Sequence, residues 1–455
     1  MQKIKKIDSF SSKLAFILVT AGAAVGLGNI WAFPFVVGNN GGGAFFLLYL
    51  VVLLLIATPV FVAELLLGRM GEASPPNALK ALSKTYNTRV SWQWIAWVGM
   101  IATLLILSYY SVIAGQAVAY GVKSMMGEWS NLTPGGVLAV DGAYKDTVGT
   151  PALWHTVFMV LTTFVVAQDI RQGIERAAKW LMPLLFILLL FMVLYSMTTA
   201  GFGEAFAFLF TFEAVDFTPS MFITSFGLAF FTLSIGVGGI MMFGAYMGKE
   251  VKLGNAVGWI VLMDLVVAVM AGLAIFPLVF THGLDAAAGP GLVFQTLPII
   301  FASIVGGGVL GAAFFLLLTV AALTSAVSLM APAVQWLTEK GWSRKKAAVV
   351  IGLIIYLLGY VTVFSFNIWS DWYPLSFIEA LDGATLFDLI REGVNIVILP
   401  LGGFVFALLV GWVIPREAVQ KALAANNGII FKIWHVSLRY IVPLAIIALF
   451  LSSFI

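Results

Sequence analysis

The chain has 455 residues, of which 61% are hydrophobic and 10% are charged, and its formal net charge is +3 at neutral pH. Charged residues make up about a quarter of an ordinary soluble protein, so this composition excludes a water-soluble globular enzyme and indicates a helical membrane protein. The absence of cysteine excludes disulfides and cysteine-ligated metals, and the wide spacing of the three histidines (His155, His282, His435) argues against a histidine-based metal site.

Apolar stretches of membrane-spanning length follow one another along the chain. A transmembrane helix needs about 20 mainly apolar residues. On that scale the sequence predicts eleven spans, in chain order 11–37, 42–67, 92–122, 152–168, 177–199, 218–247, 254–281, 299–337, 347–365, 386–413 and 431–454. Because the first apolar run continues to Val37, it is too long for a cleaved signal peptide. We therefore expect an all-α polytopic membrane protein forming a single domain over residues 1–455.

The basic residues are distributed unevenly between the connecting segments. With the N-terminus placed in the cytoplasm, all of the 24 lysines and arginines except Lys123, Lys145 and Arg391 fall in cytoplasmic segments. This is the asymmetry of the positive-inside rule. Since the number of spans is odd, we expect the C-terminus on the external side.

The first and sixth spans are interrupted by small and polar residues. The interruptions are GAAVGLGN at residues 22–29 and TLSIGVGG at residues 232–239. Unwinding a helix in hydrocarbon frees backbone N–H and C=O groups, which is costly unless an ion or a charged ligand takes them up. Glycine-interrupted spans in matching positions of two halves indicate a transporter binding site. We therefore expect one five-helix repeat at 11–199, a second at 218–413 and an eleventh helix at 431–454. The alternative is that the glycines only allow close helix packing.

Two carboxylates lie far from the ends of predicted spans or within strongly apolar sequence, Asp264 and Glu64. Asp264 is in the seventh span, within VLMDLVV, and a carboxylate at that depth is expensive and usually functional. The alternative for Asp264 is a position near a helix end, from which it reaches the cytoplasmic interface. For Glu64 in the second span, we expect pairing with internal backbone or polar groups rather than contact with a substrate.

Hydroxyl groups also lie inside two spans. Thr324 and Ser325 stand in the middle of the eighth span, within ALTSAVSL, and Tyr109 and Tyr110 are in the third. The two short hydroxyls either bond within their own helix or face a neighbouring one. We expect one of the two tyrosines to turn its hydroxyl inward and the other to face lipid or pack against a helix.

Several segments together resemble the neurotransmitter:sodium symporter family, and most of all its bacterial amino-acid transporters. The segments are AGAAVGLGNIWAFP, NNGGGAFFLLYL, QGIERAAKWLMP, FFTLSIGVGG and AALTSAVSLMAP. The resemblance covers nearly the whole chain and implies the LeuT fold, with two inverted five-helix repeats, in the bacterial plasma (inner) membrane. The family usually has twelve helices, and the eleven here are typical of one bacterial branch.

The resemblance further implies two sodium sites and no organic cofactor. The first would use the Ala24 carbonyl, the Asn29 side chain, Thr232 and Asp264, with the substrate carboxylate completing the shell. The second would use the carbonyls of Gly22, Val25 and Ala321 and the hydroxyls of Thr324 and Ser325. These shells contain only oxygen and suit a hard cation. The choice of sodium comes from the family.

The family pattern also assigns a substrate site. The carboxylate would meet the N–H groups of Leu27 and Gly28 and the Tyr110 hydroxyl, the amine would meet the carbonyls of Ala24, Phe231 and Thr232 and the Ser234 hydroxyl, and the side chain would contact Ile106, Phe231, Val237, Ser325 and Leu329. Ala24 stands where amine-transporting members carry an aspartate, which favours an amino acid over an amine. Because the pocket is apolar and Val237 replaces a bulkier residue, we expect large aliphatic or aromatic amino acids.

The gates depart in part from the family. Ala32 replaces the arginine of the outer gate, so the usual external salt bridge cannot form, and Phe231 and Tyr110 would close the site by packing alone or with other partners. At the inner gate the resemblance assigns Tyr246 and Glu339, with Lys5 or Lys6 as the basic partner of Glu339. Some relatives bind chloride near the first sodium. Asp264 supplies a fixed negative charge there, so we expect chloride-independent transport.

These features predict sodium-coupled symport of hydrophobic L-amino acids by alternating access. The expected partners are the amino acid and the lipid bilayer, with no nucleic acid, and the oligomeric state stays open. The alternative is a substrate-gated channel or sensor on the same scaffold. An intramembrane enzyme is disfavoured, because the sequence contains no cysteine and neither an HExxH nor a GxSxG motif.

Overall fold

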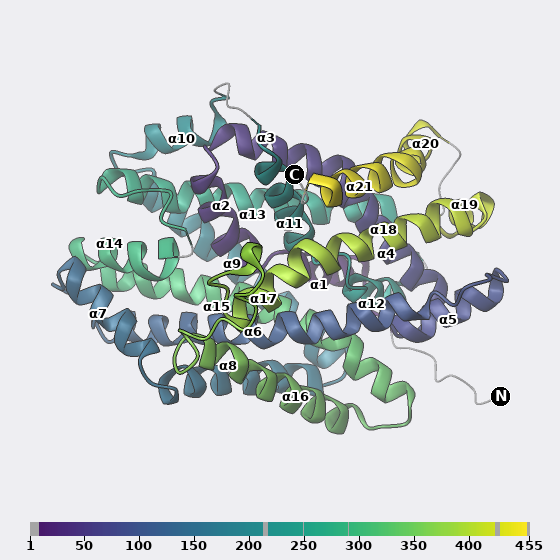
Figure 1. The fold of residues 1–455 in the computed structure, drawn as a ribbon, viewed down its shortest axis with the longest axis horizontal. Coiled ribbons are helices and arrows are strands. Elements are labelled where there is room, and N and C mark those ends of the chain that lie inside the picture. Colours follow the sequence, from purple (N-terminus) through teal and green to yellow (C-terminus); the bar gives the residue numbers. More distant parts are fainter. Residues whose placement is uncertain (1–8, 213–216, 249, 290, 424–427, 453–455) are drawn as a thin grey trace.

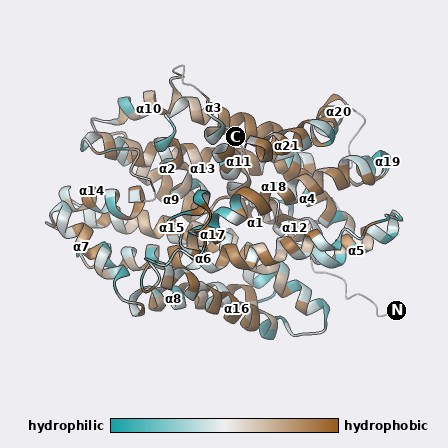
Figure 2. Cartoon of the chain, in the orientation of Figure 1, coloured by the Kyte–Doolittle hydropathy of each residue, from teal (hydrophilic) through white to brown (hydrophobic). Residues whose placement is uncertain are grey.

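The computed structural model describes residues 9–212, 217–248, 250–289, 291–423 and 428–452. Within these ranges all regular secondary structure is helical and no strand occurs. Several long helices run roughly parallel to one another across the molecule (Figure 1). Hydrophobic residues dominate these helices, and hydrophilic residues concentrate in the connecting segments and at helix ends (Figure 2). The prediction of an all-α membrane protein is confirmed.

The first five predicted spans each correspond to a helix or a chain of helical segments. They are α1 (Lys13–Ala24), η1 (Gly28–Ala32) and α2 (Phe33–Asn39); α3 (Gly43–Val52), η2 (Leu53–Ala57) and α4 (Thr58–Gly71); α6 (Gln93–Met125); α8 (Gly149–Ala167); and η3 (Arg171–Glu175) with α9 (Arg176–Ser196). The π-helical turns η1, η2 and η3 join their neighbours without ending the span, except at the break between α1 and η1.

The remaining six spans are likewise present. They are α11 (Pro219–Thr232) with α12 (Gly239–Tyr246); α13 (Leu253–Thr281); α15 (Gly307–Glu339); α16 (Arg344–Ser365); α17 (Leu386–Glu392), η6 (Gly393–Ile398), α18 (Leu399–Leu408) and η7 (Leu409–Val413); and α20 (Ile429–Val436), η8 (Ser437–Ile441) and α21 (Val442–Ser452). Shorter helices connect them: α5 (Pro75–Thr85), α7 (Pro134–Lys145), α10 (Phe202–Phe210), η4 (Leu292–Thr296), α14 (Leu297–Ser303), η5 (Glu379–Leu381) and α19 (Arg416–Leu423).

The number of spans agrees with the prediction. In the described part of the chain, nine helices are long and apolar enough to cross a membrane, and the bent pair of α1 with η1–α2 makes a tenth. The eleventh is the broken span of α11 and α12, whose halves of 14 and 8 residues are each too short alone.

One predicted boundary is wrong. The eighth span begins at Gly307 rather than at residue 299, because residues 299–303 belong to the separate helix α14. The apolar character continues across both helices, but the chain turns between them, where Gly306 adopts a φ of 78° that favours glycine. Hydropathy alone therefore merged two helices into one.

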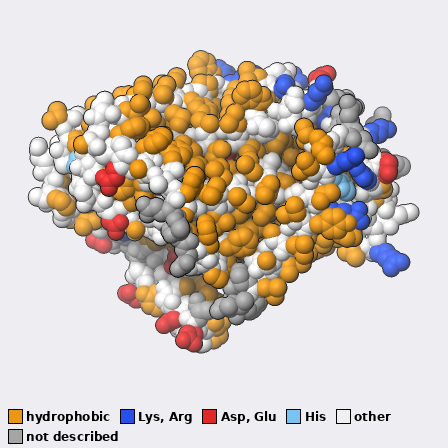
Figure 3. Space-filling view, turned by 90° about the horizontal axis from the view of Figure 1, so that it is seen from above, with side chains coloured by type: hydrophobic (Ala, Val, Ile, Leu, Met, Phe, Trp, Pro, Cys, Tyr) orange, Lys and Arg blue, Asp and Glu red, His pale blue; other side chains and the backbone are white. Residues whose placement is uncertain are grey.

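The two ends of the molecule differ in charge. Lysines and arginines gather at one end of the space-filling view, and most of the visible acidic side chains lie toward the other (Figure 3). The cationic end carries α5, α19 and the start of α20 (Figure 1). Between the ends, α15 packs along α6, and α1 packs against both α13 and α15. This packing brings the interrupted first span into the centre of the bundle.

Candidate functional site

The first span is broken at the predicted place. Helix α1 ends at Ala24, the π-helical turn η1 begins at Gly28, and the two halves of the span meet at an angle of 47°. The residues of the break are completely buried, so water from outside the protein does not satisfy the freed backbone groups. They must find partners inside the bundle.

The sixth span is broken between Thr232 and Gly239. Three residues of the break have left-handed backbone conformations, with φ values of 54° at Ser234, 89° at Gly236 and 71° at Gly238. A Cβ atom on Gly236 would lie 2.1 Å from the carbonyl oxygen of Leu399, so only glycine fits there. Both interruptions predicted from the sequence are therefore real breaks rather than glycine-rich packing surfaces.

Glu64 holds one of the freed backbone groups of the sixth span. Its side chain is fully buried in α4, and one carboxylate oxygen accepts a hydrogen bond from the N–H of Gly236. This confirms that Glu64 pairs with internal backbone. A carboxylate near the start of α12 also lies at the positive end of the helix dipole.

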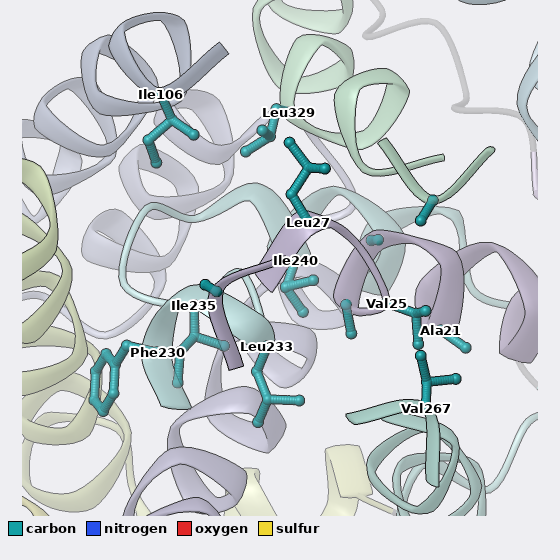
Figure 4. Packing of buried hydrophobic residues seen from close by; sticks show 14 of the residues in the cluster. Ala21, Val25, Leu27, Ile106, Phe230, Leu233, Ile235, Ile240, Val267 and Leu329 are labelled. Carbon is teal, nitrogen blue, oxygen red and sulfur yellow. The ribbon is translucent and has the colours of Figure 1, made fainter. Parts of the chain in front are cut away.

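The two breaks enclose a cavity in the middle of the bundle. Ten of the eleven predicted substrate residues line it: Ala24, Leu27, Gly28, Ile106, Tyr110, Phe231, Ser234, Val237, Ser325 and Leu329. Figure 4 shows Leu27 beside Leu329, with Ile106 on the neighbouring α6. The eleventh, Thr232, is fully buried beside the cavity but does not line it, and its hydroxyl lies 3.2 Å from that of Tyr49.

Two residues of the cavity wall were missed by the sequence analysis, Gly26 and Leu399. A Cβ atom on Gly26 would lie 2.3 Å from the Ser325 hydroxyl and 3.0 Å from that of Tyr110. Gly26 therefore keeps the space between these hydroxyls open. The sequence could have identified Gly26 as a cavity residue, because it lies inside the glycine-rich break. It could not have identified Leu399, which is one apolar residue among many in its span.

The cavity has an apolar end and a polar end. Apolar side chains from α6, the sixth-span break and α15 form one wall, through Ile106, Val237 and Leu329. At the other end the Leu27 N–H donates to the Tyr110 hydroxyl over 3.2 Å. Of the two adjacent tyrosines, Tyr110 is therefore the one that reaches the break. The Ser234 hydroxyl donates to the Ala23 carbonyl over 3.0 Å and ties the two breaks together.

Two of the residues assigned to the first sodium site, Asn29 and Asp264, are in direct contact. The Asn29 amide nitrogen donates to one carboxylate oxygen of Asp264 over 2.8 Å and to its backbone carbonyl over 3.0 Å. The other carboxylate oxygen is buried and has no hydrogen-bond partner among the described residues. An unpaired buried carboxylate oxygen is costly, and a bound cation would supply the missing partner. Asp264 lies inside the bundle and not at a helix end, which excludes the interfacial alternative.

The residues assigned to the second sodium site converge on Ser325. Its hydroxyl oxygen lies 3.3 Å from each of the carbonyl oxygens of Gly22, Ala23 and Val25. A hydroxyl has only one proton to donate, so this hydroxyl cannot serve all three carbonyls. On the same helix, the Thr324 hydroxyl donates to the Ala321 carbonyl over 2.9 Å. The donor set is rich in oxygen and fits a hard cation.

The described residues contain no cluster of three or more His, Asp or Glu side chains that could hold a metal ion. Both candidate cation sites depend instead on carbonyl, hydroxyl and amide oxygens with at most one carboxylate. Such weak-field oxygen shells bind alkali or alkaline-earth cations rather than transition metals.

A second cavity, which we call the vestibule, adjoins the first at Phe231, which lines both cavities. Ala32, at the position of the outer-gate arginine, also lines this vestibule. Opposite stand Arg391 and Glu392, which form an ion pair of 2.6 Å. The charged residues that line the vestibule are thus carried by α17 rather than by the first span.

Elsewhere in the bundle, a chain of hydrogen bonds joins the two residues that the resemblance assigns to the inner gate, Tyr246 and Glu339. The Tyr246 hydroxyl donates to the Gln335 amide oxygen over 3.1 Å, and the Gln335 amide nitrogen donates to Glu339 over 3.3 Å. Glu339 also accepts from the Ser74 N–H at 2.7 Å and the Asn77 amide at 2.6 Å, both at the start of α5. The proposed basic partners, Lys5 and Lys6, lie outside the described residues. The Phe10 N–H donates to the Tyr246 carbonyl over 3.0 Å.

Comparison with known proteins gives consistent matches over the whole chain. The profile of the "Sodium:neurotransmitter symporter family" matches residues 7–134 and 135–455. A sodium-dependent transporter of Bacillus subtilis, YhdH, is 37% identical over 458 residues, covering 98% of each chain. A sodium-dependent transporter of Haemophilus influenzae is 31% identical over 457 residues, covering 99% of this chain and 98% of the relative.

A solved structure also matches this chain over nearly its full length. The crystal structure of MhsT in complex with L-phenylalanine superposes with a TM-score of 0.90 at 38% sequence identity. The match covers 98% of this chain and 99% of MhsT. A similarity of this size over the full length shows a common fold.

Proposed function

The chain belongs to the Sodium:neurotransmitter symporter family, and on that premise we propose that it imports large hydrophobic L-amino acids together with sodium. The family consists of transporters, so the expectation that the protein is not an enzyme is confirmed. The chain has the LeuT fold, as expected from its motifs. The proposal concerns the substrate, the ions and the coupling between them.

One observation carries the proposal. Buried oxygen atoms exceed their hydrogen-bond donors at two places in the bundle, at the unpaired Asp264 oxygen and at the Ser325 hydroxyl with its three carbonyl neighbours. A bilayer does not tolerate such groups without a partner. We assign a sodium ion to each: the first to Ala24, Asn29, Thr232 and Asp264, and the second to Gly22, Val25, Ala321, Thr324 and Ser325.

The polarity of the cavity supports an amino acid with a hydrophobic side chain. The N–H groups of Leu27 and Gly28 and the Tyr110 hydroxyl stand at the polar end, where a carboxylate would accept hydrogen bonds. Ile106, Val237 and Leu329 supply the apolar wall. In MhsT the bound molecule is L-phenylalanine, an amino acid of the proposed class.

The binding of sodium and the binding of substrate would be coupled because the two ligands lie next to each other. If the substrate carboxylate completes the shell of the first sodium, each ligand raises the affinity for the other by the same factor. Inward movement of sodium then drives uptake, with about 2.3 kcal/mol for each charge per 100 mV of membrane potential. Alternating access would move the outer barrier at Phe231 and the inner barrier at Tyr246 and Glu339 in turn. The carboxylate of Asp264 makes chloride unnecessary.

The proposal includes the arrangement in the membrane. The repeats are residues 11–199 and 218–413, with the eleventh helix at 431–454. The cationic end of the molecule faces the cytoplasm, which places the N-terminus inside and the C-terminus outside a bacterial plasma membrane. The charge separation seen in Figure 3 supports this orientation.

Uptake by proteoliposomes tests the function directly. Radiolabelled leucine, phenylalanine, tryptophan, glycine and aspartate are offered with an inward sodium gradient, with potassium in place of sodium, and with gluconate in place of chloride. We expect sodium-dependent, chloride-independent accumulation of the three hydrophobic amino acids above the external concentration. Preference for glycine or aspartate would refute the pocket assignment. Equilibration without accumulation would favour the channel or sensor alternative.

A further inference from the structure

A second concave surface lies on the membrane-facing side of the bundle, away from the transport cavity. It is a hydrophobic groove between the second span, α13 and α20, which we call the lateral groove. Its lining residues come from three parts of the molecule: 54–62 on η2 and α4, 254–265 on α13, and, at the end of α19 and along α20 and η8, residue 423 and residues 428–437. Most lining side chains are aliphatic or aromatic, including Val257, Leu262, Ile430 and Trp434.

The length of the lateral groove matches one leaflet of a bilayer. From Gly254 to Leu265 helix α13 rises by about 16 Å, at 1.5 Å per residue. Half of a bilayer's hydrocarbon core is about 15 Å thick. The groove begins at the cationic end of the molecule, where α13 and α20 start, and it ends near the middle of the spans. An extended acyl chain of one leaflet therefore has the right length for it.

Hydrogen bonds fix the walls of the groove. The Ser437 hydroxyl donates to the Leu55 carbonyl over 2.7 Å, and the Trp434 indole N–H donates to the Pro59 carbonyl over 3.3 Å. These bonds tie α20 and η8 to the second span and use up their polar groups. A Cβ atom on Gly254 or Gly258 would meet no atom within 4 Å, so the α13 wall is open.

Three lysines stand at the cationic end of the groove. Lys252 precedes the lining residue Gly254 by two positions, Lys421 precedes the lining residue Leu423 by two, and Lys432 lies between two lining residues of α20. All three are exposed. In the described part of the chain none forms a salt bridge, although Glu250 and Glu417 are close in sequence. Their positive charges remain available to an anion at the membrane surface.

We propose that the lateral groove binds one anionic phospholipid of the cytoplasmic leaflet, with an acyl chain along α13 and the phosphate among Lys252, Lys421 and Lys432. Hydrocarbon is the solvent at this depth, and basic pockets between helix ends on the cytoplasmic side recognise acidic headgroups. A second copy of the chain is a poorer occupant. A twofold contact through this groove would bring the same three lysines of both copies together, and their repulsion would oppose it.

The charge is tested by comparing two lipids with identical chains. Native mass spectrometry of the purified full-length protein measures retention of phosphatidylglycerol and phosphatidylcholine. A lysine at the surface contributes about fivefold to binding an acidic lipid, so we expect phosphatidylglycerol to be favoured by about tenfold or more. In Lys252→Gln/Lys421→Gln/Lys432→Gln the preference should fall close to parity. The matched control Lys80→Gln/Lys84→Gln/Lys345→Gln removes three exposed cytoplasmic-end charges outside the groove and should keep the preference.

The location is tested with a phosphatidylglycerol that carries a diazirine on its acyl chain. We expect cross-links to peptides containing residues 254–265 and 429–437. A Cβ atom on Gly258 would meet no atom within 4 Å, and leucine favours helix, so Gly258→Leu should place a side chain in the groove and reduce these cross-links at least about fivefold. Gly203→Leu, at another open position on α10, should not.

Three results would overturn the proposal. They are equal retention of both lipids by the unmodified protein, cross-links that lie outside the groove, and a dimer that loses its groove lipid while the groove peptides cross-link to a second copy. None of these measurements requires transport activity, so the lipid site can fail while the symport proposal stands, and the reverse also holds.

Discussion

The most informative single change is Asp264→Asn, which removes the charge of the proposed first sodium site and little else. The side chain keeps its shape, and its remaining oxygen can still accept the hydrogen bond that Asn29 donates over 2.8 Å. The oxygen without a partner becomes an amide nitrogen, which repels a cation instead of binding it. We expect the sodium requirement to rise and chloride to become a useful substitute for the lost charge.

The size of the effect follows from the burial of the site. Two unit charges 4 Å apart attract by about 4 kcal/mol at an effective dielectric constant of about 20. Since about 1.4 kcal/mol is a factor of ten in affinity, the upper limit is about a thousandfold. The other oxygen ligands remain, and we therefore expect the sodium concentration for half-maximal uptake to rise by about tenfold to a hundredfold.

The assay is phenylalanine uptake into proteoliposomes as a function of sodium, in chloride and in gluconate. The unmodified protein should give the same sodium curve in both anions. Asp264→Asn should be nearly inactive in gluconate and partly restored in chloride. An unchanged sodium curve in gluconate, for a variant that is folded and inserted, would show that Asp264 does not face the ion.

Three further substitutions test other parts of the site. Ser325→Ala removes the hydroxyl shared by three carbonyls and should raise the sodium requirement at least about tenfold, whereas Ser328→Ala, whose hydroxyl bonds within its own helix, should change it less than about twofold. Gly26→Ala places a Cβ atom 2.3 Å from the Ser325 hydroxyl and should abolish phenylalanine binding measured by scintillation proximity, while Gly203→Ala, with no atom within 4 Å, should not. Glu339→Gln weakens the hold on Ser74 and Asn77 and should favour the inward-open state, seen as faster labelling of a cysteine introduced near Tyr246; equal labelling rates would exclude an inner-gate role.

The fold was predictable because each membrane span can be recognised from the apolar composition of its own residues. A continuous apolar run can be identified without knowing which helices it packs against. Helices are present at each of the eleven predicted spans. The error at residues 299–307 arose because hydropathy does not register a turn inside an apolar run. The π-helical turns, such as η2 and η6, could not be predicted from the sequence either, because most of their residues are apolar like those on either side.

The site was predictable where it interrupts the apolar pattern. The two glycine-rich breaks and the buried polar residues Asp264, Thr324 and Ser325 stand out in any membrane span. Two other features depend on which helices pack together, and helix packing cannot be read from a single sequence. They are the hydrogen bond from the Ser234 hydroxyl to the Ala23 carbonyl and the place of Leu399 in the cavity wall. The partners of Glu339 likewise come from α5, far away in the chain.

The two proposed barriers around the central cavity, the outer one at Phe231 and the inner one at Tyr246 and Glu339, are built differently. On the outer side a single aromatic ring, that of Phe231, touches both the cavity and the vestibule. On the inner side a bonded series runs from Phe10 through Tyr246 and Gln335 to Glu339 and the start of α5. A ring can swing aside in one rotation, whereas the series must be dismantled bond by bond. A substrate analogue with a bulky extension beside its amino acid moiety would therefore wedge the outer side open and arrest the cycle there, which makes the vestibule the natural place to attach an inhibitor.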